Sequence, residues 1–245
     1  MHLVLDIGNT RTKAGLFDGA TLAYQATWTG QPTEAILDWA YNHSPTAALL
    51  ATSGEAGEAL EAGLRARGIP VVRLHHGLRL PFENRYATPE TLGRDRIAGV
   101  AGAAVRYPGE TCLVVDAGTC ITLDLLTADG VYHGGNISPG VRMRLRAMHA
   151  QTARLPLVEP DPEDTGLLGV STETALRKGG QLGATLEIEA FVARCTARYG
   201  PPRVLLTGGD AALLAPHLKT KIFATPHLVL YGLHEILRLH VDTES

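Results

Sequence analysis

The sequence has little lysine, little cysteine and no long apolar run, and its formal net charge is only -3 at pH 7 over 245 residues. Without a stripe of basic side chains, it lacks the electrostatic footprint of a nucleic-acid-binding protein. No apolar run is long enough to span a bilayer. We therefore predict no nucleic-acid partner and no membrane attachment.

The three cysteines are an odd number and have no Cys-x-x-Cys spacing, which argues against a disulfide framework or a zinc site. They are better explained as small buried residues in a reducing cytoplasm. The first residues predict a strand with Asp6 close behind, which is not the pattern of a signal peptide. We expect a cytoplasmic protein. The histidines show no ligand spacing.

Two apolar runs, residues 3–5 and 112–115, each lead into an aspartate, then a glycine and a polar turn that carries a threonine. Such a strand is buried, its aspartate emerges at the end, and the glycine allows close approach to a ligand. Backbone N–H groups and hydroxyls can hold phosphate oxygens, and the carboxylate can hold a cation. One such turn is typical of a β-hairpin. Two in one chain predict a nucleotide held by two related halves.

Apolar periodicity predicts alternating strands and helices, with strands at 2–6, 13–17, 21–27, 47–51, 71–74, 110–116, 120–126, 131–134 and 203–206. Helices are predicted at 32–42, 55–67, 94–107, 141–152 and 231–241. Residues 172–199 are predicted to be mostly helical with a break near Gly179-Gly180, and the acidic, proline-rich stretch 155–165 to be an exposed loop. The strand–turn–strand opening recurs after Gly109, which predicts domains at 1–108 and 109–245.

Six motifs, in order along the whole chain, resemble those of the type III pantothenate kinases, from the superfamily that includes acetate kinase, sugar kinases and actin. They are the two phosphate motifs at 6–15 and 116–119, the substrate motif Gly93-Arg94-Asp95-Arg96, and the segments 134–140, 169–172 and 207–210. Ala117, where an aromatic residue is usual, and Cys120 depart from the pattern without removing a polar group. The resemblance implies an α/β fold of two actin-like (ribonuclease H-like) domains related by internal duplication, with mixed sheets flanked by helices.

The resemblance further implies ATP-dependent phosphorylation of the pantothenate hydroxyl to 4'-phosphopantothenate, the first step of coenzyme A biosynthesis. ATP and pantothenate would be the partners, with Mg2+ and a monovalent cation, K+ or NH4+, as cofactors. Asp95 would be the general base, Asp6 would hold Mg2+, and Asp116 the monovalent cation. ATP and its phosphates would contact Asp6, Ile7, Gly8, Asn9, Thr10, Arg11, Thr12, Lys13 and Thr119. Pantothenate would contact Tyr86, Gly93, Arg94, Asp95, Arg96 and Thr172.

Several of these residues have simpler explanations. Asp95 could be a helix-start acid paired with a neighbouring arginine, Lys13 a solvated strand residue, Tyr86 a core residue and Asp116 a turn-capping acid. The resemblance also implies a homodimer. The helix at 141–152 carries an apolar stripe at Val141, Leu145 and Met148 that could form its interface or pack on the chain's own core.

Three other functions compete with the kinase. A non-catalytic accessory regulator of gene expression on the same scaffold would not need Asp6, Asp95, Arg96 and Asp116 together. Another small-molecule kinase or a phosphohydrolase of the superfamily would lack the substrate motif at 93–96. A filament-forming actin relative would need more assembly surface than this short chain offers. Fold does not decide among them, so the site residues carry the choice.

Overall fold

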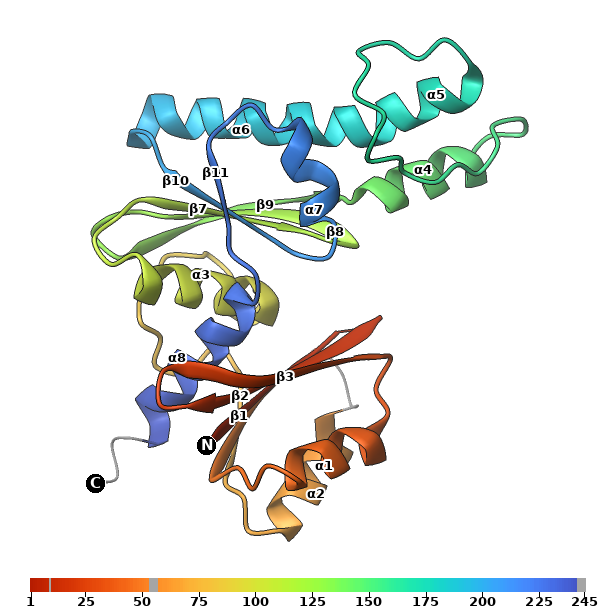
Figure 1. Cartoon of the computed structure of the whole chain (residues 1–245). Helices are drawn as coiled ribbons and strands as arrows, with labels where there is room; N and C mark the ends of the chain where they lie inside the picture. The colour runs from red at the N-terminus through yellow and green to blue at the C-terminus, as the bar shows by residue number, and fades with distance from the viewer. Residues whose placement is uncertain (9, 53–56, 242–245) are drawn as a thin grey trace. The chain divides into compact units, whose positions relative to one another are not determined.

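The computed structural model of the chain describes residues 1–8, 10–52 and 57–241. The chain divides into two compact units, one formed by Met1–Pro108 with His227–Ser245 and the other by Gly109–Pro226. Each holds a mixed β-sheet flanked by helices (Figure 1), so the predicted α/β class is confirmed. The segment from His227 onward makes its contacts with the first unit, whereas the predicted boundary at Gly109 left it in the second domain.

The sheet of the first unit has the strand order β3-β2-β1-β4-β5. Its strands are β1 (His2–Ile7), β2 (Arg11–Asp18), β3 (Thr21–Thr29), β4 (Ala47–Thr52) and β5 (Val71–Arg73). β2 runs antiparallel to β1 and β3, whereas β4 runs parallel to β1 and β5. The central strands β1 and β4 are apolar along nearly their whole length because both faces of the sheet are covered.

Four helices cover the first sheet: α1 (Thr33–Tyr41), α2 (Gly57–Ala66), α3 (Arg94–Arg106) and α8 (Leu228–Val241). The unit also contains the short strand β6 (Glu83–Asn84) and the 3-10 helix η1 (Pro89–Thr91). α1 and α2 pack on one face of the sheet, and α8 contacts β1 and α3. α3 and α8 approach closely because Gly102 and Gly232 face the other helix; a Cβ at either position would collide with backbone. Glycine at these two positions thus allows the close packing of the two helices.

The second unit repeats the topology of the first, in the order β9-β8-β7-β10-β11. Its strands are β7 (Cys112–Ala117), β8 (Cys120–Leu126), β9 (Val131–Pro139), β10 (Arg203–Thr207) and β11 (Ile222–Ala224). β8 is antiparallel to β7 and β9, and β10 is parallel to β7 and β11. Strand directions and order therefore match those of the first unit, with β7 in the place of β1. β9 continues past the predicted end at residue 134 because it pairs with β8 as far as Pro139.

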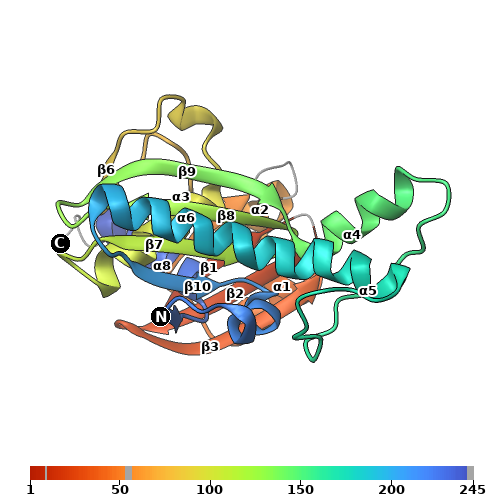
Figure 2. The same ribbon diagram turned by 90° about the horizontal axis from the view of Figure 1, so that it is seen from above.

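One face of the second sheet is covered by helices, and α6 lies along it (Figure 2). The helices are α4 (Val141–Ala150), α5 (Thr172–Arg177), the π-helical turn η2 (Lys178–Leu182), α6 (Gly183–Tyr199), α7 (Ala211–Leu214) and the 3-10 helix η3 (Ala215–His217). The π turn falls at the predicted break near Gly179-Gly180. Residues 155–165 contain no helix or strand, as predicted.

The apolar stripe of α4 packs inside its own unit. Val141 and Leu145 are fully buried in the core of the second sheet, and Met148 packs against that core. Of the two alternatives for this stripe, a dimer interface or packing on the chain's own core, the structure shows the second. A contact between subunits would have to use the other side of α4, where Arg142, Met143 and Arg146 are exposed.

Two of the three cysteines are buried as the sequence predicts, and Cys120 is half-buried. None forms a disulfide, and Cys112 and Cys195 are buried. Burial and the nearby carboxylate of Glu110 raise the pKa of the Cys112 thiol to about 11, and burial raises the pKa of Cys195. Both thiols are therefore neutral apolar groups at physiological pH. In the described part of the chain, no helix combines the length and apolarity needed to cross a membrane.

Candidate active site

The first of the two glycine turns follows β1, and Asp6 is the second-to-last residue of that strand. Asp6 is half-buried and lies directly opposite Lys13 of β2, so the two side chains project from the same face of the sheet. Beyond the strand, the Gly8 N–H donates to the Arg11 carbonyl at 3.0 Å, and Gln31 Nε2 donates to the Gly8 carbonyl at 3.2 Å. Asn9 lies outside the described residues.

The loop after β3 supports this turn through Gly30. The Thr12 side chain is fully buried and its hydroxyl donates to the Gly30 carbonyl at 2.7 Å, while the Gly30 N–H donates to the Thr10 carbonyl at 2.8 Å. Ile7 is part of the core. The exposed side chains of the turn are those of Thr10 and Arg11. Of the predicted phosphate contacts, Ile7 and Thr12 thus lie beneath the turn and fix it, whereas Thr10 and Arg11 face solvent.

The charge of Lys13 acts on a second residue of the same unit. Burial, and then the positive charge of Lys13, hold the pKa of His227 below its ordinary value. His227 directly precedes α8 and has a φ of 62°. A neutral imidazole beside Lys13 leaves the lysine as the local positive charge near Asp6.

The substrate motif begins α3, with Gly93 at the N-cap position and Asp95 in the first turn. The Asp95 side chain is exposed, and its Oδ1 accepts a hydrogen bond from the Arg96 N–H at 2.9 Å. A Cβ on Gly93 would lie 2.5 Å from Asp95 Oδ1, so glycine leaves room for the carboxylate. The helix N-terminus stabilises the anion. The result is a solvent-accessible carboxylate in a fixed orientation.

The two arginines of the motif have different surroundings. Arg94 Nε donates to the Leu74 carbonyl at 2.8 Å, which ties the start of α3 to the end of the β5 segment. Arg96 is 5% exposed, and its guanidinium carbon lies 5.4 Å from the centre of the Tyr86 ring. Tyr86 itself is placed by its N–H, which donates to Asn84 Oδ1 at 3.0 Å. The structure thus brings Tyr86 and the Arg96 side chain together at the start of α3, where Asp95 is exposed one residue earlier.

The second turn follows β7. Asp116 is half-buried and is flanked in the sheet by Thr122 of β8 and Thr207 of β10, whose side chains project from the same face. The turn itself is tight, because the Gly118 N–H donates to the Cys120 carbonyl at 2.9 Å. Thr119 is exposed at its tip. The charged carboxylate of Asp116 and the uncharged hydroxyls of Thr122 and Thr207 therefore lie on neighbouring strands, where they could serve as oxygen ligands of a cation.

Two further segments pack against this turn. The Gly140 N–H, at the start of α4, donates to the Thr119 carbonyl at 3.0 Å. The Asp210 N–H donates to the Ala117 carbonyl at 2.8 Å, and Gly208 (φ 98°) leaves no room for a Cβ against Ala117 and the Asp116 carboxylate. The structure therefore places the turn of the motif segment 207–210 against Asp116.

Arginines of α4 join these segments, which sequence reasoning did not predict. Arg142 pairs with Asp210, and Arg144 pairs with Glu187 of α6 and donates through Nε to the Pro139 carbonyl at 2.8 Å. Burial alone would raise the pKa of Glu187, but hydrogen bonds from Ser138 and Arg144 and the charge of Arg144 outweigh it, and the pKa is lowered. The only signal in the sequence was the density of arginine in this helix.

Thr172 is the first residue of α5 and its side chain is exposed. Ser171 caps the helix, and the Ser171 and Thr174 side chains form a reciprocal capping box. Thr172 is thus held at a well-defined helix start.

No group of three or more His, Cys, Asp or Glu side chains that could hold a metal ion occurs among the described residues. A divalent ion at Asp6 would therefore take its remaining ligands from nucleotide phosphates and water, as Mg2+ commonly does. The single carboxylate fits that coordination. An all-protein metal site does not fit these described residues.

The duplicated sheet, with an aspartate near the end of the first strand of each unit, is an actin-like fold. The chain is similar to a ROK hexokinase from Thermus thermophilus, with a TM-score of 0.53 and 15% identity over 100% of this chain and 99% of the other. It is also similar to a Campylobacter jejuni protein described as a candidate Baf family transcriptional activator, with a TM-score of 0.66 and 22% identity over 98% and 99% of the two chains. These likenesses are of fold alone.

The chain belongs to the type III pantothenate kinase family. The family model matches residues 2–194. A type III pantothenate kinase from Bacteroides fragilis is 41% identical over 237 residues, which cover 97% of each chain. The resemblance of the ordered motifs to this family is confirmed. The members are enzymes, and a kinase family implies a divalent metal bound with the nucleotide.

Proposed function

We propose that this chain phosphorylates the hydroxyl of pantothenate with ATP, which produces 4'-phosphopantothenate for coenzyme A biosynthesis. The observation that carries the proposal is the arrangement at the start of α3. An exposed carboxylate, Asp95, accepts a hydrogen bond from the backbone N–H of Arg96, and the buried guanidinium of Arg96 lies 5.4 Å from the centre of the Tyr86 ring. An acceptor substrate with a hydroxyl and a polar carbonyl or carboxylate group suits such a set.

In the proposed reaction, Asp95 aligns the pantothenate hydroxyl and accepts its proton as the oxygen attacks the γ-phosphorus. The new O–P bond forms while the bond from the γ-phosphorus to its bridging oxygen breaks, and ADP leaves. Because the transition state for phosphoryl transfer is loose, alignment contributes more than strong basicity, which suits an exposed aspartate. Arg96 offers its fork of donors to a carboxylate or amide oxygen of the substrate.

The phosphates of ATP are assigned to the two glycine turns. In the first turn, Gly8 would allow close approach, Asn9, Thr10 and Arg11 would supply donors, and Lys13 of β2 would add positive charge. Thr119 would supply a hydroxyl from the second turn. Mg2+ at Asp6 would neutralise phosphate charge. Lys13, opposite Asp6 in the sheet, adds a fixed positive charge near the same point.

Asp116 is our candidate for the monovalent cation, K+ or NH4+. Support comes from its neighbours Thr122 and Thr207, which are hydroxyl residues in register on both adjacent strands. Hard monovalent ions favour such oxygen-rich surroundings. Free, buried cysteines are consistent with a reducing compartment, and we infer that the enzyme is cytoplasmic.

We also propose a homodimer, with the loop before Thr172 at its interface instead of the apolar stripe of α4. Leu167, Leu168 and Val170 are 74%, 79% and 95% exposed, an unusual concentration of solvent-facing apolar side chains. Light scattering at micromolar protein should give twice the chain mass. Leu168→Asp should lower that mass, whereas a wild-type chain that stays monomeric while fully active would contradict the dimer.

The proposed activity is tested by Asp95→Asn. With purified protein, Mg·ATP and pantothenate, this variant should lose about 10²–10⁴-fold in kcat with little change in the KM for ATP. Glu90→Gln, an exposed acid in η1 of the same unit, is the matched control and should keep wild-type rates. Near-normal turnover of Asp95→Asn would leave Asp95 as no more than a helix-start acid.

A further inference from the structure

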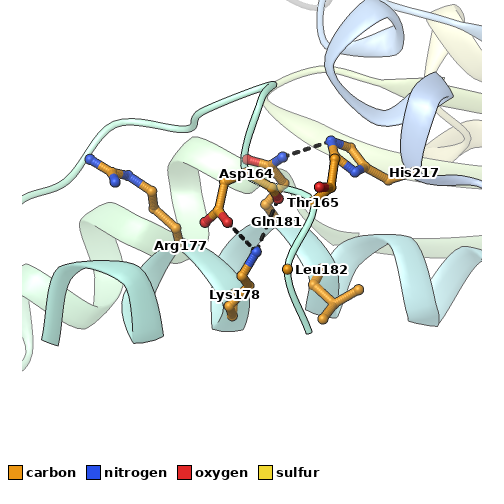
Figure 3. A pocket seen from close by; sticks show the side chains of 8 residues that line it. Asp164, Thr165, Arg177, Lys178, Gln181, Leu182 and His217 are labelled. Atoms are coloured by element: carbon orange, nitrogen blue, oxygen red, sulfur yellow. Dashed lines mark hydrogen bonds and ion pairs between the residues drawn. The ribbon is translucent and has the colours of Figure 1, made fainter. Parts of the chain in front are cut away.

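A loop in the second unit, residues 155–171, is fastened to the helix that follows it by side chains that the proposed reaction does not use. The loop leads directly into Thr172. Two residues of the π-helical turn η2, Lys178 and Gln181, reach back to it and line a small pocket beneath it (Figure 3). Their partners show what they hold in place.

Lys178 fixes the loop at Asp164 through two atoms. Its Nζ donates to the Asp164 carbonyl at 3.0 Å and forms an ion pair with the carboxylate. The Lys178 side chain is only 11% exposed and that of Asp164 21%. Removing one partner of such a buried pair leaves an uncompensated charge, so the contact strongly favours the observed loop position.

The second oxygen of that carboxylate is also buried. Asp164 Oδ2 is buried without a hydrogen-bond partner among the residues that the structure describes. The pocket beside it holds about 20 Å³, which is enough for one water molecule. A water there would extend the polar contact of the loop without changing its position.

Gln181 fixes the loop at Asp161, again at two points. Its Nε2 donates to the Asp161 carbonyl at 3.0 Å, and its Oε1 accepts from the Asp161 N–H at 3.2 Å. The same Nε2 lies 3.0 Å from Nε2 of His217, in η3. Gln181 thus joins the loop to η3, which follows α7.

The far end of the loop is fixed on α5 itself. Gly169 packs so closely on the backbone of Thr174 and Ala175 that a Cβ would collide. The N–H groups of Val170 and Ser171 donate to Thr174 Oγ1 at 3.0 and 2.9 Å. From Asp161 to Ser171 the loop is therefore held at successive points, and Thr172 is the first residue after the last of them.

We propose that Lys178 and Gln181 are positioning residues for the acceptor substrate, because they fix the loop that presents Thr172 to pantothenate. This inference rests on the proposed function. Neither side chain touches the substrate; both act through the loop. Pi-helical turns recur at functional sites, and here the turn places the two side chains on the loop while α6 continues along the sheet.

The test compares kinetic constants for both substrates. Lys178→Met and Gln181→Leu should each raise the KM for pantothenate by about tenfold or more, with the KM for ATP changed by less than about twofold. Lys178→Arg keeps the charge and should recover most of the loss. Lys219→Met, an exposed lysine in the same unit, is the control and should match the wild type.

Amide hydrogen exchange supplies a readout that does not need activity. Residues 159–171 should exchange faster in Lys178→Met than in the wild type, while the strands of the second sheet should not change. An unchanged KM for pantothenate, or an equal rise for both substrates with a general loss of protection, would overturn the positioning role. If the wild type does not phosphorylate pantothenate, the proposed function fails. Unchanged exchange of residues 159–171 in Lys178→Met would separately overturn the claim that Lys178 fixes the loop.

Discussion

The two glycine turns occupy equivalent places in two copies of one topology, yet their surroundings differ. In the first unit, Asp6 is opposite a lysine, and Thr10 and Arg11 are exposed in the turn beyond it. In the second unit, Asp116 is flanked by two threonines, and the segments that begin at Gly140 and Gly208 pack on the turn. The strands are duplicated, but the charges around each aspartate are not.

This difference separates the two proposed roles. Beside a lysine, a carboxylate can share a divalent ion with phosphate groups while the lysine balances their negative charge. Between the hydroxyl residues of two adjacent strands, a carboxylate offers the oxygen-rich surroundings that we propose for a monovalent ion. The same strand-end aspartate can therefore serve two kinds of cation.

The largest effect is expected from Asp6→Ala. If Asp6 holds the nucleotide-bound metal, kcat/KM should fall by about 10³-fold or more, which corresponds to ~4 kcal/mol of transition-state stabilisation. Circular dichroism and the thermal midpoint should stay close to wild type, because a half-exposed strand-end carboxylate is not a core group. Asp18→Ala, at the exposed far end of β2, is the matched control. Loss of the fold along with activity would make Asp6 structural.

A smaller and different effect is expected from Asp116→Ala. Wild-type activity should rise about tenfold or more when potassium replaces sodium, a change of ~1.4 kcal/mol, and the variant should respond equally to both ions. Thr207→Val, which removes one neighbouring hydroxyl, should shift the potassium midpoint upward and keep the maximal rate. Full wild-type activity in a sodium-only buffer would remove the cation role from Asp116 and with it the contrast between the two turns.

The packing of the second turn can be tested through its glycine. Gly208→Ala should lower the free energy of unfolding by about 3 kcal/mol or more, because a methyl group would collide with Ala117 and the Asp116 carboxylate. Gly19→Ala, also at positive φ but with no neighbour within 4 Å, should cost about 1–2 kcal/mol from backbone conformation alone. Urea titrations of both variants measure the difference. Equal losses would show that contact with Asp116 does not restrain the turn.

The local sequence pattern was sufficient to predict the strands that the two units share. The strands around Asp6 and Asp116 were predicted to within a few residues because a buried apolar run and a glycine turn are both local signals. The break near Gly179 was also visible, although glycines alone do not specify a π turn. α7 and β11 were not predicted, because four-residue and three-residue elements have no measurable period.

Long-range pairing could not be predicted. The contacts of Arg142 with Asp210 and of Lys178 with Asp164 join segments that only the folded sheet brings near. The apolar stripe of α4 shows the same limit. Its helical spacing is the same whether Leu145 faces a core or a partner chain, and only the tertiary structure distinguishes the two cases. For the same reason, the sequence did not show that α8 packs with the first unit.

The place of α8 has a consequence for synthesis on the ribosome. The second unit is contiguous, so all of its strands and helices have been made once residue 226 has left the exit tunnel. The first unit begins earlier but lacks α8 until after that point, and the surfaces of α3 and β1 that α8 covers stay bare meanwhile. The half made first is therefore completed last, and a nascent chain stalled near residue 226 would present an apolar sheet face to chaperones.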